Sequence, residues 1–124
     1  MNTLLLDTHT LIWFGTDPSK LSANATQAII NADQVYVSFA SAWEYVIKRS
    51  LGRPEFSRPF TDIMLGAPVL SLAVEFEIYA EIESLPPIHR DPFDRLLIAQ
   101  ALHHDLTLIS KDKAIAKYPV KTLW

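Results

Sequence analysis

Residues 3–8 read Thr-Leu-Leu-Leu-Asp-Thr, a short apolar run that stops at an acid. An uninterrupted apolar run of this length is typical of a strand whose two faces are both buried, as in a parallel sheet covered by helices. We therefore expect a first strand over Thr3–Leu6, with Asp7 at its carboxyl end. A helix is predicted directly after it, from Thr8 to Phe14.

The rest of the chain alternates between helical and strand patterns. Further strands are expected over Val35–Ser38, Pro68–Leu72 and Thr107–Ile109, with a short final one over Val120–Leu123. Further helices are expected from the cap Ser22 to Asn31, and over Ala40–Leu51, Phe60–Leu65, Val74–Glu83 and Pro92–His104. This alternation predicts an α/β fold, a three-layer αβα sandwich whose central, mostly parallel sheet has four to five strands.

Composition narrows the class of protein. A chain of 124 residues with 49% hydrophobic and 20% charged residues is expected to fold as a single domain, 1–124. The net charge of -3 argues against nucleic-acid binding by bulk electrostatics, and three glycines offer no phosphate-binding loop. The absence of cysteine excludes disulfides and thiol chemistry. The amino-terminal residues resemble neither a signal peptide nor a membrane span, so we expect a cytoplasmic protein.

Acids stand where a parallel sheet collects functional groups, which is just beyond the carboxyl ends of its strands. Asp7 follows the first predicted strand, and Glu44 lies in the helix after the second strand. Asp91 and Asp94 open the helix that precedes the fourth strand, and Asp112 follows that strand. Glu44 is predicted on a face with Ala40, Ile47 and Leu51, and Asp94 on one with Leu97, Ile98 and Ala101. Because unpaired buried carboxylates are unfavourable, such a cluster calls for a hard divalent cation, Mg²⁺ or Mn²⁺.

Each acid also has a structural alternative. Asp7 and Asp91 can each cap the helix that follows, and Glu44 can pair with a lysine one turn later. Asp94, at the third helical position, can reach back to a backbone N–H as in a capping box. Asp112, between two lysines, can be a solvated loop acid. Their joint topology is what favours one common site.

Other polar and aromatic residues are assigned structural roles. Trp13, Trp43 and Phe93 occupy positions typical of core packing. His103 and His104 are adjacent, so they are expected to point in different directions on the surface and to match no metal-binding spacing. His9 and His89 lie near the predicted rim, where a structural role is favoured over substrate contact.

Four segments of this chain are similar to one known family. They are Leu4-Leu5-Leu6-Asp7-Thr8-His9, Ser41-Ala42-Trp43-Glu44, the run from His89 to Ala101 that reads HRDPFDRLLIAQA, and Leu106-Thr107-Leu108-Ile109-Ser110-Lys111-Asp112. Together they resemble the PIN-domain ribonucleases, and most of all the VapC-like toxins of bacterial toxin–antitoxin pairs. The likeness extends from Leu4 to Trp124.

The resemblance implies a three-layer αβα fold, a homodimer, and RNA cleavage that depends on Mg²⁺ or Mn²⁺. It also implies a small VapB-like antitoxin whose tail occupies the acidic groove. The residues that match the family's acidic quartet are Asp7, Glu44, Asp94 and Asp112. Asp91 matches an additional acid of the subgroup with the His-Arg-Asp-Pro-Phe-Asp pattern.

The expected mechanism is hydrolysis of a phosphodiester by a metal-activated water. Asp7 and Asp94 are expected as direct ligands, and Glu44 and Asp112 as ligands or as groups that orient the water. The alternatives are an aspartyl-phosphate phosphatase, a Mg²⁺-binding regulatory module and a protein-interaction module. The first two call for a second acid beside Asp7 that this chain lacks.

Overall fold

The computed structural model describes residues 2–124 and contains a five-stranded parallel sheet. The strands are β1 (Thr3–Leu6), β2 (Gln34–Ser38), β3 (Leu70–Leu72), β4 (Thr107–Ile109) and β5 (Thr122–Leu123). Their order in the sheet is β3-β2-β1-β4-β5, and every neighbouring pair is parallel. The prediction of a mostly parallel sheet is confirmed, and β1 is its central strand.

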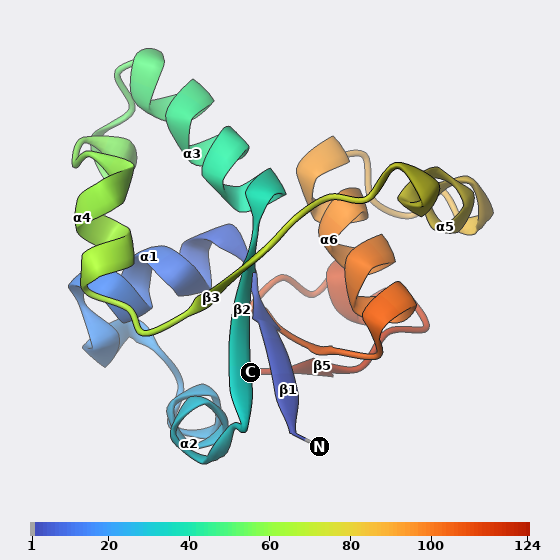
Figure 1. The fold of residues 1–124 in the computed structure, drawn as a ribbon, viewed down its shortest axis with the longest axis horizontal. Coiled ribbons are helices and arrows are strands. Elements are labelled where there is room, and N and C mark those ends of the chain that lie inside the picture. Colours follow the sequence, from blue (N-terminus) through green and yellow to red (C-terminus); the bar gives the residue numbers. More distant parts are fainter. Residues whose placement is uncertain (1) are drawn as a thin grey trace.

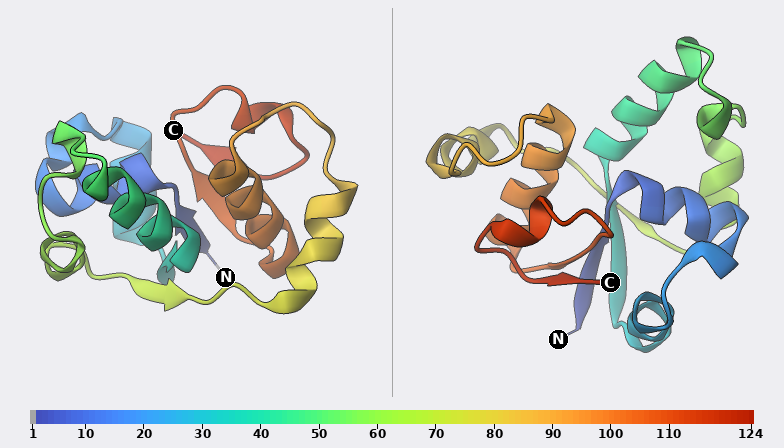
Figure 2. Two further views of the ribbon diagram at one scale, coloured as in Figure 1. Left: turned by 90° about the horizontal axis from the view of Figure 1, so that it is seen from above. Right: turned by 180° about the vertical axis from the view of Figure 1, so that it is seen from behind.

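Helices cover both faces of the sheet (Figure 1). Leu4 and Leu6 of β1 face a core formed with α1 (Thr8–Thr16), α2 (Ala23–Asn31) and α4 (Phe60–Leu65). Leu5 points the other way, as alternation along a strand requires, towards α5 (Tyr79–Ser84) and α6 (Pro92–His104). Seen from above in Figure 2, these two groups of helices lie on opposite sides of the sheet. The predicted three-layer αβα arrangement is therefore confirmed.

Helix α3 (Phe39–Ser50) follows β2 directly and leaves the sheet at its carboxyl edge (Figure 1). It contacts α1 and α4 on one side and α6 on the other. Short 3₁₀ turns complete the fold at Pro18–Lys20, Pro54–Phe56, Phe76–Ile78 and Ile115–Lys117. Because α3 contacts the helices of both outer layers next to the carboxyl ends of the strands, its side chains can contribute to a site at this edge of the sheet.

Helices α1 and α4 touch backbone to backbone. A Cβ atom placed on Gly66 would lie 2.4 Å from the carbonyl oxygen of Gly15, and one on Gly15 would lie 2.7 Å from that of Ile63. Both distances are far below van der Waals contact, so only glycine fits at either position in this packing.

The predicted helix over Val74–Glu83 is wrong in its first half. Residues 73–75 are irregular, a 3₁₀ turn follows, and α5 begins only at Tyr79. The side chain of Gln100 donates a hydrogen bond to the carbonyl of Ala73 at 3.1 Å. This tertiary hydrogen bond engages a carbonyl that the predicted helix would have used internally, in keeping with the irregular backbone at residues 73–75.

Two expectations about α3 are also corrected. Trp43 is not a core residue, since 52% of it is exposed, and Ile47 and Leu51 are exposed as well. The buried face of α3 carries Ala40 and Glu44, as expected, and Tyr45 in place of Ile47 and Leu51. Trp13 does pack against the core of the α1 layer. None of the helices within residues 2–124 is long and apolar enough to cross a bilayer.

Candidate active site

Asp7 stands at the point where the sheet reverses its order. Strand β1 pairs with β2 on one side and β4 on the other, so its carboxyl end opens the crevice in which parallel sheets bind ligands. The Asp7 carboxylate accepts hydrogen bonds from the backbone N–H of Thr10 at 2.9 Å and from the Ser110 hydroxyl at 2.6 Å. Asp7 therefore caps α1 as the structural alternative required, and it is also only 8% exposed.

Glu44 lies on the buried side of α3 and is 4% exposed. Its Oε1 accepts a hydrogen bond from the Thr8 hydroxyl at 2.6 Å, and its Oε2 lies 2.5 Å from Nζ of Lys48. The pair one helical turn apart is thus present. The Ser41 hydroxyl lies 3.0 Å from that of Thr8 and completes a polar network on this face.

The first turn of α6 carries two acids with different contacts. Oδ1 of Asp91 accepts hydrogen bonds from the backbone N–H groups of Phe93 at 2.8 Å and Asp94 at 3.2 Å, so Asp91 is the helix cap. Asp94 does not form the capping box. Its Oδ2 instead lies 2.9 Å from Nε2 of His89. As expected, it shares the inward side of α6 with the buried Leu97 and Ile98.

His89 joins two of the acids. Its Nε2 also lies 3.1 Å from Oδ2 of Asp112, which follows β4. Asp112 is fixed further by its own backbone, since its N–H donates to the Ser110 hydroxyl at 3.0 Å and its Oδ1 accepts from the Ala114 N–H at 2.8 Å. Ser110 thereby connects Asp7 with Asp112.

All five predicted acids line one open pocket of about 410 Å³, together with Lys48, His89 and Lys111. They come from the ends of β1 and β4 and from two helices, so segments far apart in sequence meet at one edge of the sheet. Sequence reasoning missed the hydroxyl groups of Thr8, Ser41 and Ser110. A signal was present for Ser110, which directly follows a strand at the same edge.

Burial and neighbouring carboxylates disfavour the charged form of the acids in this pocket. Burial raises the pKa of Asp94 from 3.8 to about 7, the Asp91 carboxylate adds to the rise, and His89 opposes it. Burial also raises the pKa of Asp7, although its hydrogen bonds to Ser110 and Thr10 act in the opposite direction. Carboxyl groups in this state gain most from a nearby cation, and their oxygen donors suit a hard divalent ion.

The raised pKa of Asp94 predicts a pH-dependent stability of the metal-free chain. Because folding raises this pKa, the associated stability is complete below the unfolded value near 4 and is lost as pH rises through about 7. With a chelator present, we expect the free energy of unfolding in urea to fall by about 2 to 3 kcal/mol between pH 5 and pH 8.

The substitution Asp94→Asn should make this pH dependence shallower. The exposed Asp105, paired with Lys121 on the surface, supplies the control Asp105→Asn, which should keep the wild-type slope. A wild-type stability that is constant or rises over this range would contradict the assignment of the shift to Asp94.

The chain is similar to known proteins over nearly its whole length. The model of the PIN domain family matches residues 4–121. The chain belongs to the PIN-domain family. Ribonuclease VapC22 of Mycobacterium tuberculosis (strain ATCC 25618 / H37Rv) is 31% identical over 131 residues, covering 100% of both chains. The resemblance found in the four sequence segments is therefore confirmed.

Solved structures share the fold of this PIN domain. The crystal structure of VapBC2 from Rickettsia felis, bound to a DNA fragment from their promoter, matches with a TM-score of 0.73 and 10% identity over 98% of this chain and 97% of that chain. FitAcB from Neisseria gonorrhoeae matches with a TM-score of 0.63 and 21% identity over 98% and 96%. At these identities the likeness supports the fold alone.

Proposed function

We propose that this PIN domain is a divalent-metal-dependent endoribonuclease and the toxin of a toxin–antitoxin pair, acting in the cytoplasm. The observation that carries the proposal is the meeting of four acids from separate segments in one pocket: Asp7, Glu44, Asp94 and Asp112. The ribonuclease relative with 31% identity over the whole chain supports the same reading.

The donor set fits Mg²⁺ or Mn²⁺. Asp7 and Asp94 are the proposed direct ligands, since burial makes both carboxyl groups depend on a compensating charge. Glu44 and Asp112 complete the set as ligands or as groups that orient the attacking water. When bound, the cation lowers the pKa of a water and offsets the charge that develops on the phosphoryl oxygens.

The chain's own residues hold these carboxylates in place. Ser110 and the Thr10 backbone fix Asp7, and Thr8 and Lys48 fix Glu44. Their hydrogen bonds leave lone pairs on each carboxylate for the cation, so the donors are oriented before RNA arrives. Lys111 also lines the pocket and supplies a positive charge for the phosphate backbone.

The direct test is incubation of the purified chain with RNA in Mg²⁺, in Mn²⁺ and in a chelator, followed by mapping of the RNA ends. We expect internal cleavage only with a divalent ion, leaving a 3′-hydroxyl and a 5′-phosphate. Equal cleavage in the chelator would overturn the proposed mechanism. An intact RNA under every metal condition would favour a protein-interaction module instead.

Asp91 is proposed to act mainly as the cap that positions Asp94, although its free Oδ2 leaves metal contact open to it. Asn caps a helix as well as Asp, whereas Ala costs about 1 kcal/mol. We therefore expect Asp91→Asn to retain stability in urea and most RNA cleavage, and Asp91→Ala to lose stability. If Asp91→Asn instead weakened Mn²⁺ binding as strongly as Asp94→Asn, Asp91 would be a metal ligand.

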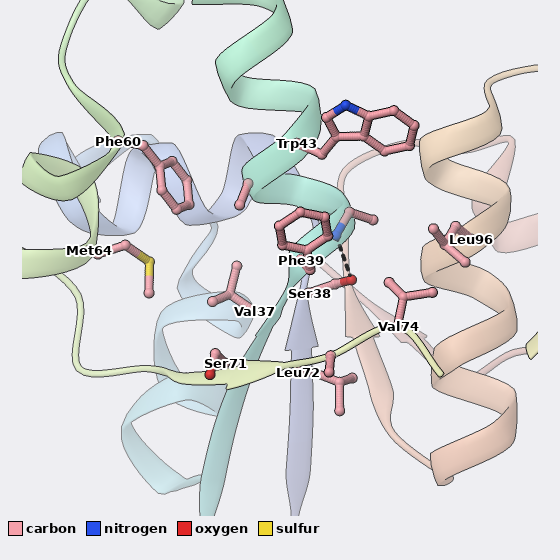
Figure 3. Close-up of a pocket in the computed structure, with 13 residues that line it drawn as sticks. Val37, Ser38, Phe39, Trp43, Phe60, Met64, Ser71, Leu72, Val74 and Leu96 are labelled. Carbon is pink, nitrogen blue, oxygen red and sulfur yellow. Dashed lines mark hydrogen bonds between the residues drawn. The ribbon is translucent and has the colours of Figure 1, made fainter. Parts of the chain in front are cut away.

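A protein partner is proposed for an apolar groove beside the acidic pocket. The groove has a volume of about 640 Å³ and lies among α3, α4, β3 and α6 (Figure 3). Its lining includes Phe39, 60% exposed, and Trp43, 52% exposed. The solved structures that share this fold include VapBC2 and FitAcB. We propose that the partner of this chain is an antitoxin whose apolar segment fills the groove while its tail reaches the acids.

We also propose that the chain forms a homodimer. Light scattering of the purified chain, which gives its mass in solution, would test this.

Trp43→Ala is expected to weaken antitoxin binding by about 30-fold, the effect of removing one central aromatic contact. The antitoxin would be the product of a short open reading frame adjacent to this gene, and the measurement is isothermal titration calorimetry. Phe76→Ala is the matched control because Phe76 is exposed and lies outside the groove. Equal affinity for both variants would remove the groove as the binding surface.

A further inference from the structure

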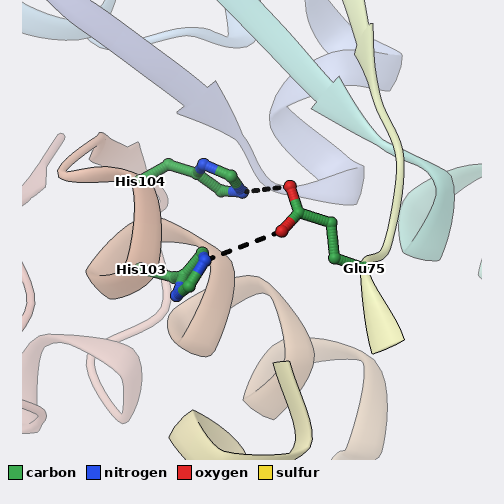
Figure 4. A group of neighbouring side chains, drawn as sticks. All are labelled: Glu75, His103 and His104. Carbon is green, nitrogen blue, oxygen red and sulfur yellow. Dashed lines mark ion pairs between the residues drawn. The ribbon is translucent and has the colours of Figure 1, made fainter. Parts of the chain in front are cut away.

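The two ends of α6 carry different chemistry. Its first turn supplies Asp94 to the acidic pocket, and its last turn carries His103 and His104, about 14 Å away along the helix axis. The segment between β3 and α5 carries Glu75, whose side chain points toward this second end of α6 (Figure 4). His103 is exposed and His104 is half-buried, in line with the surface positions expected for them, but Glu75 lies near both rings.

Glu75 forms long ion-pair contacts with both histidines, one through each carboxylate oxygen, at separations that also suit metal coordination. Oε2 of Glu75 lies 3.7 Å from Nε2 of His103, and Oε1 lies 3.6 Å from Nε2 of His104. Both separations are too long for a hydrogen bond. Ligand atoms bound to one tetrahedral Zn²⁺ at its usual bond lengths are separated by about 3.4 Å. One ligand atom from each of the three residues already lies within 4.8 Å of the others.

Glu81 lies where metal sites often have a carboxylate that does not bind the ion but holds a ligating histidine. Nδ1 of His103 faces Oε1 of Glu81, on α5, at 3.5 Å. A carboxylate on the far nitrogen of a metal-bound imidazole fixes the ring and its tautomer. All four side chains are partly exposed, so an ion can enter from solvent and the side chains can adjust around it.

We infer that Glu75, His103 and His104 form a second metal site, selective for Zn²⁺ and other imidazole-binding ions. Two imidazoles and one carboxylate suit Zn²⁺, whereas the acidic pocket presents mainly oxygen donors of the kind that Mg²⁺ and Mn²⁺ prefer. Water fills the remaining coordination position. The bound ion ties the crossover before α5 to the end of α6 and stabilises the layer on that face.

The test is titration of the purified chain with Zn²⁺ alone, followed by calorimetry and by thermal unfolding. The background is Asp94→Asn, which weakens the acidic pocket while leaving the second site intact. We expect one Zn²⁺ per chain and a rise in melting temperature of about 5 °C or more. His104→Gln and Glu75→Gln should each abolish both effects, and Glu81→Gln should weaken binding by about tenfold.

His9→Gln is the matched control, because His9 pairs with a single surface carboxylate, Glu55, at 3.2 Å. It should bind Zn²⁺ as the Asp94→Asn background does. The absorption spectrum of Co²⁺ in the visible range gives an independent readout of a four-coordinate site with nitrogen ligands. Zn²⁺ binding that survives both His104→Gln and Glu75→Gln, or no binding in the Asp94→Asn background, would overturn the assignment.

Discussion

The substitution Asp94→Asn is expected to lower RNA cleavage by at least about a hundredfold at saturating Mn²⁺. Asn keeps the shape of the side chain but removes the charge that attracts the cation. The loss is large because the Asp94 side chain is only 18% exposed, so little water is available to replace the missing carboxylate as a ligand. Asp7→Asn should have an effect of the same size. The measurement is the initial rate of cleavage of a fluorogenic RNA.

The matched control for both variants is Asp105→Asn. Asp105 ends α6 in the left-handed backbone region, with φ of 53°, which Asn tolerates well, and it lies outside the acidic pocket. Its activity should equal that of the wild type. Circular dichroism of each variant checks that the fold is retained. Wild-type cleavage by folded Asp94→Asn protein would contradict the proposed function and would leave the Zn²⁺ inference standing, since that site is tested by binding.

Gly66→Ala is expected to destabilise the fold by about 3 kcal/mol. The added Cβ would meet the Gly15 carbonyl oxygen at 2.4 Å, and neither backbone atom can move without separating α1 from α4. This cost greatly exceeds the gain that Ala usually brings to a helix. Urea unfolding monitored by tryptophan fluorescence measures the effect.

The variant Gly52→Ala is the comparison for Gly66→Ala, because it changes a residue with positive φ without introducing a steric clash. Gly52 has φ of 75°, but a Cβ there would have no neighbour within 4 Å. We expect this variant to lose only about 1 kcal/mol. If Gly66→Ala were no more destabilising than Gly52→Ala, the close packing of α1 and α4 would not limit stability as argued.

The sequence predicted those features that local patterns determine. The apolar run at Thr3–Leu6 and the capped start at Asp91–Pro92 appear in the structure where they were expected. The acids could be grouped because parallel strands bring their carboxyl ends to one edge. The same logic extends to Ser110, which directly follows β4 at that edge, whereas the hydroxyl groups of Thr8 and Ser41 carry no distinctive spacing.

The remaining differences have tertiary causes. The irregular backbone at Ala73 accepts a hydrogen bond from the side chain of Gln100, which lies in α6. The exposure of Trp43 depends on how α3 leaves the sheet, and the cluster at His103 depends on where the crossover before α5 passes. No short window of sequence contains both partners of these contacts, so pattern reasoning had no access to them.

The strand order β3-β2-β1-β4-β5 has a consequence for the nascent chain during translation. The central strand β1 is synthesised first, yet its neighbour β4 is made only after nearly all other elements. Ser110 and Asp112, which arrive with β4, are needed to complete the surroundings of Asp7. A growing polypeptide therefore has no complete acidic pocket while the ribosome is still adding the earlier segments, and the pocket is assembled only once β4 has been made and has docked.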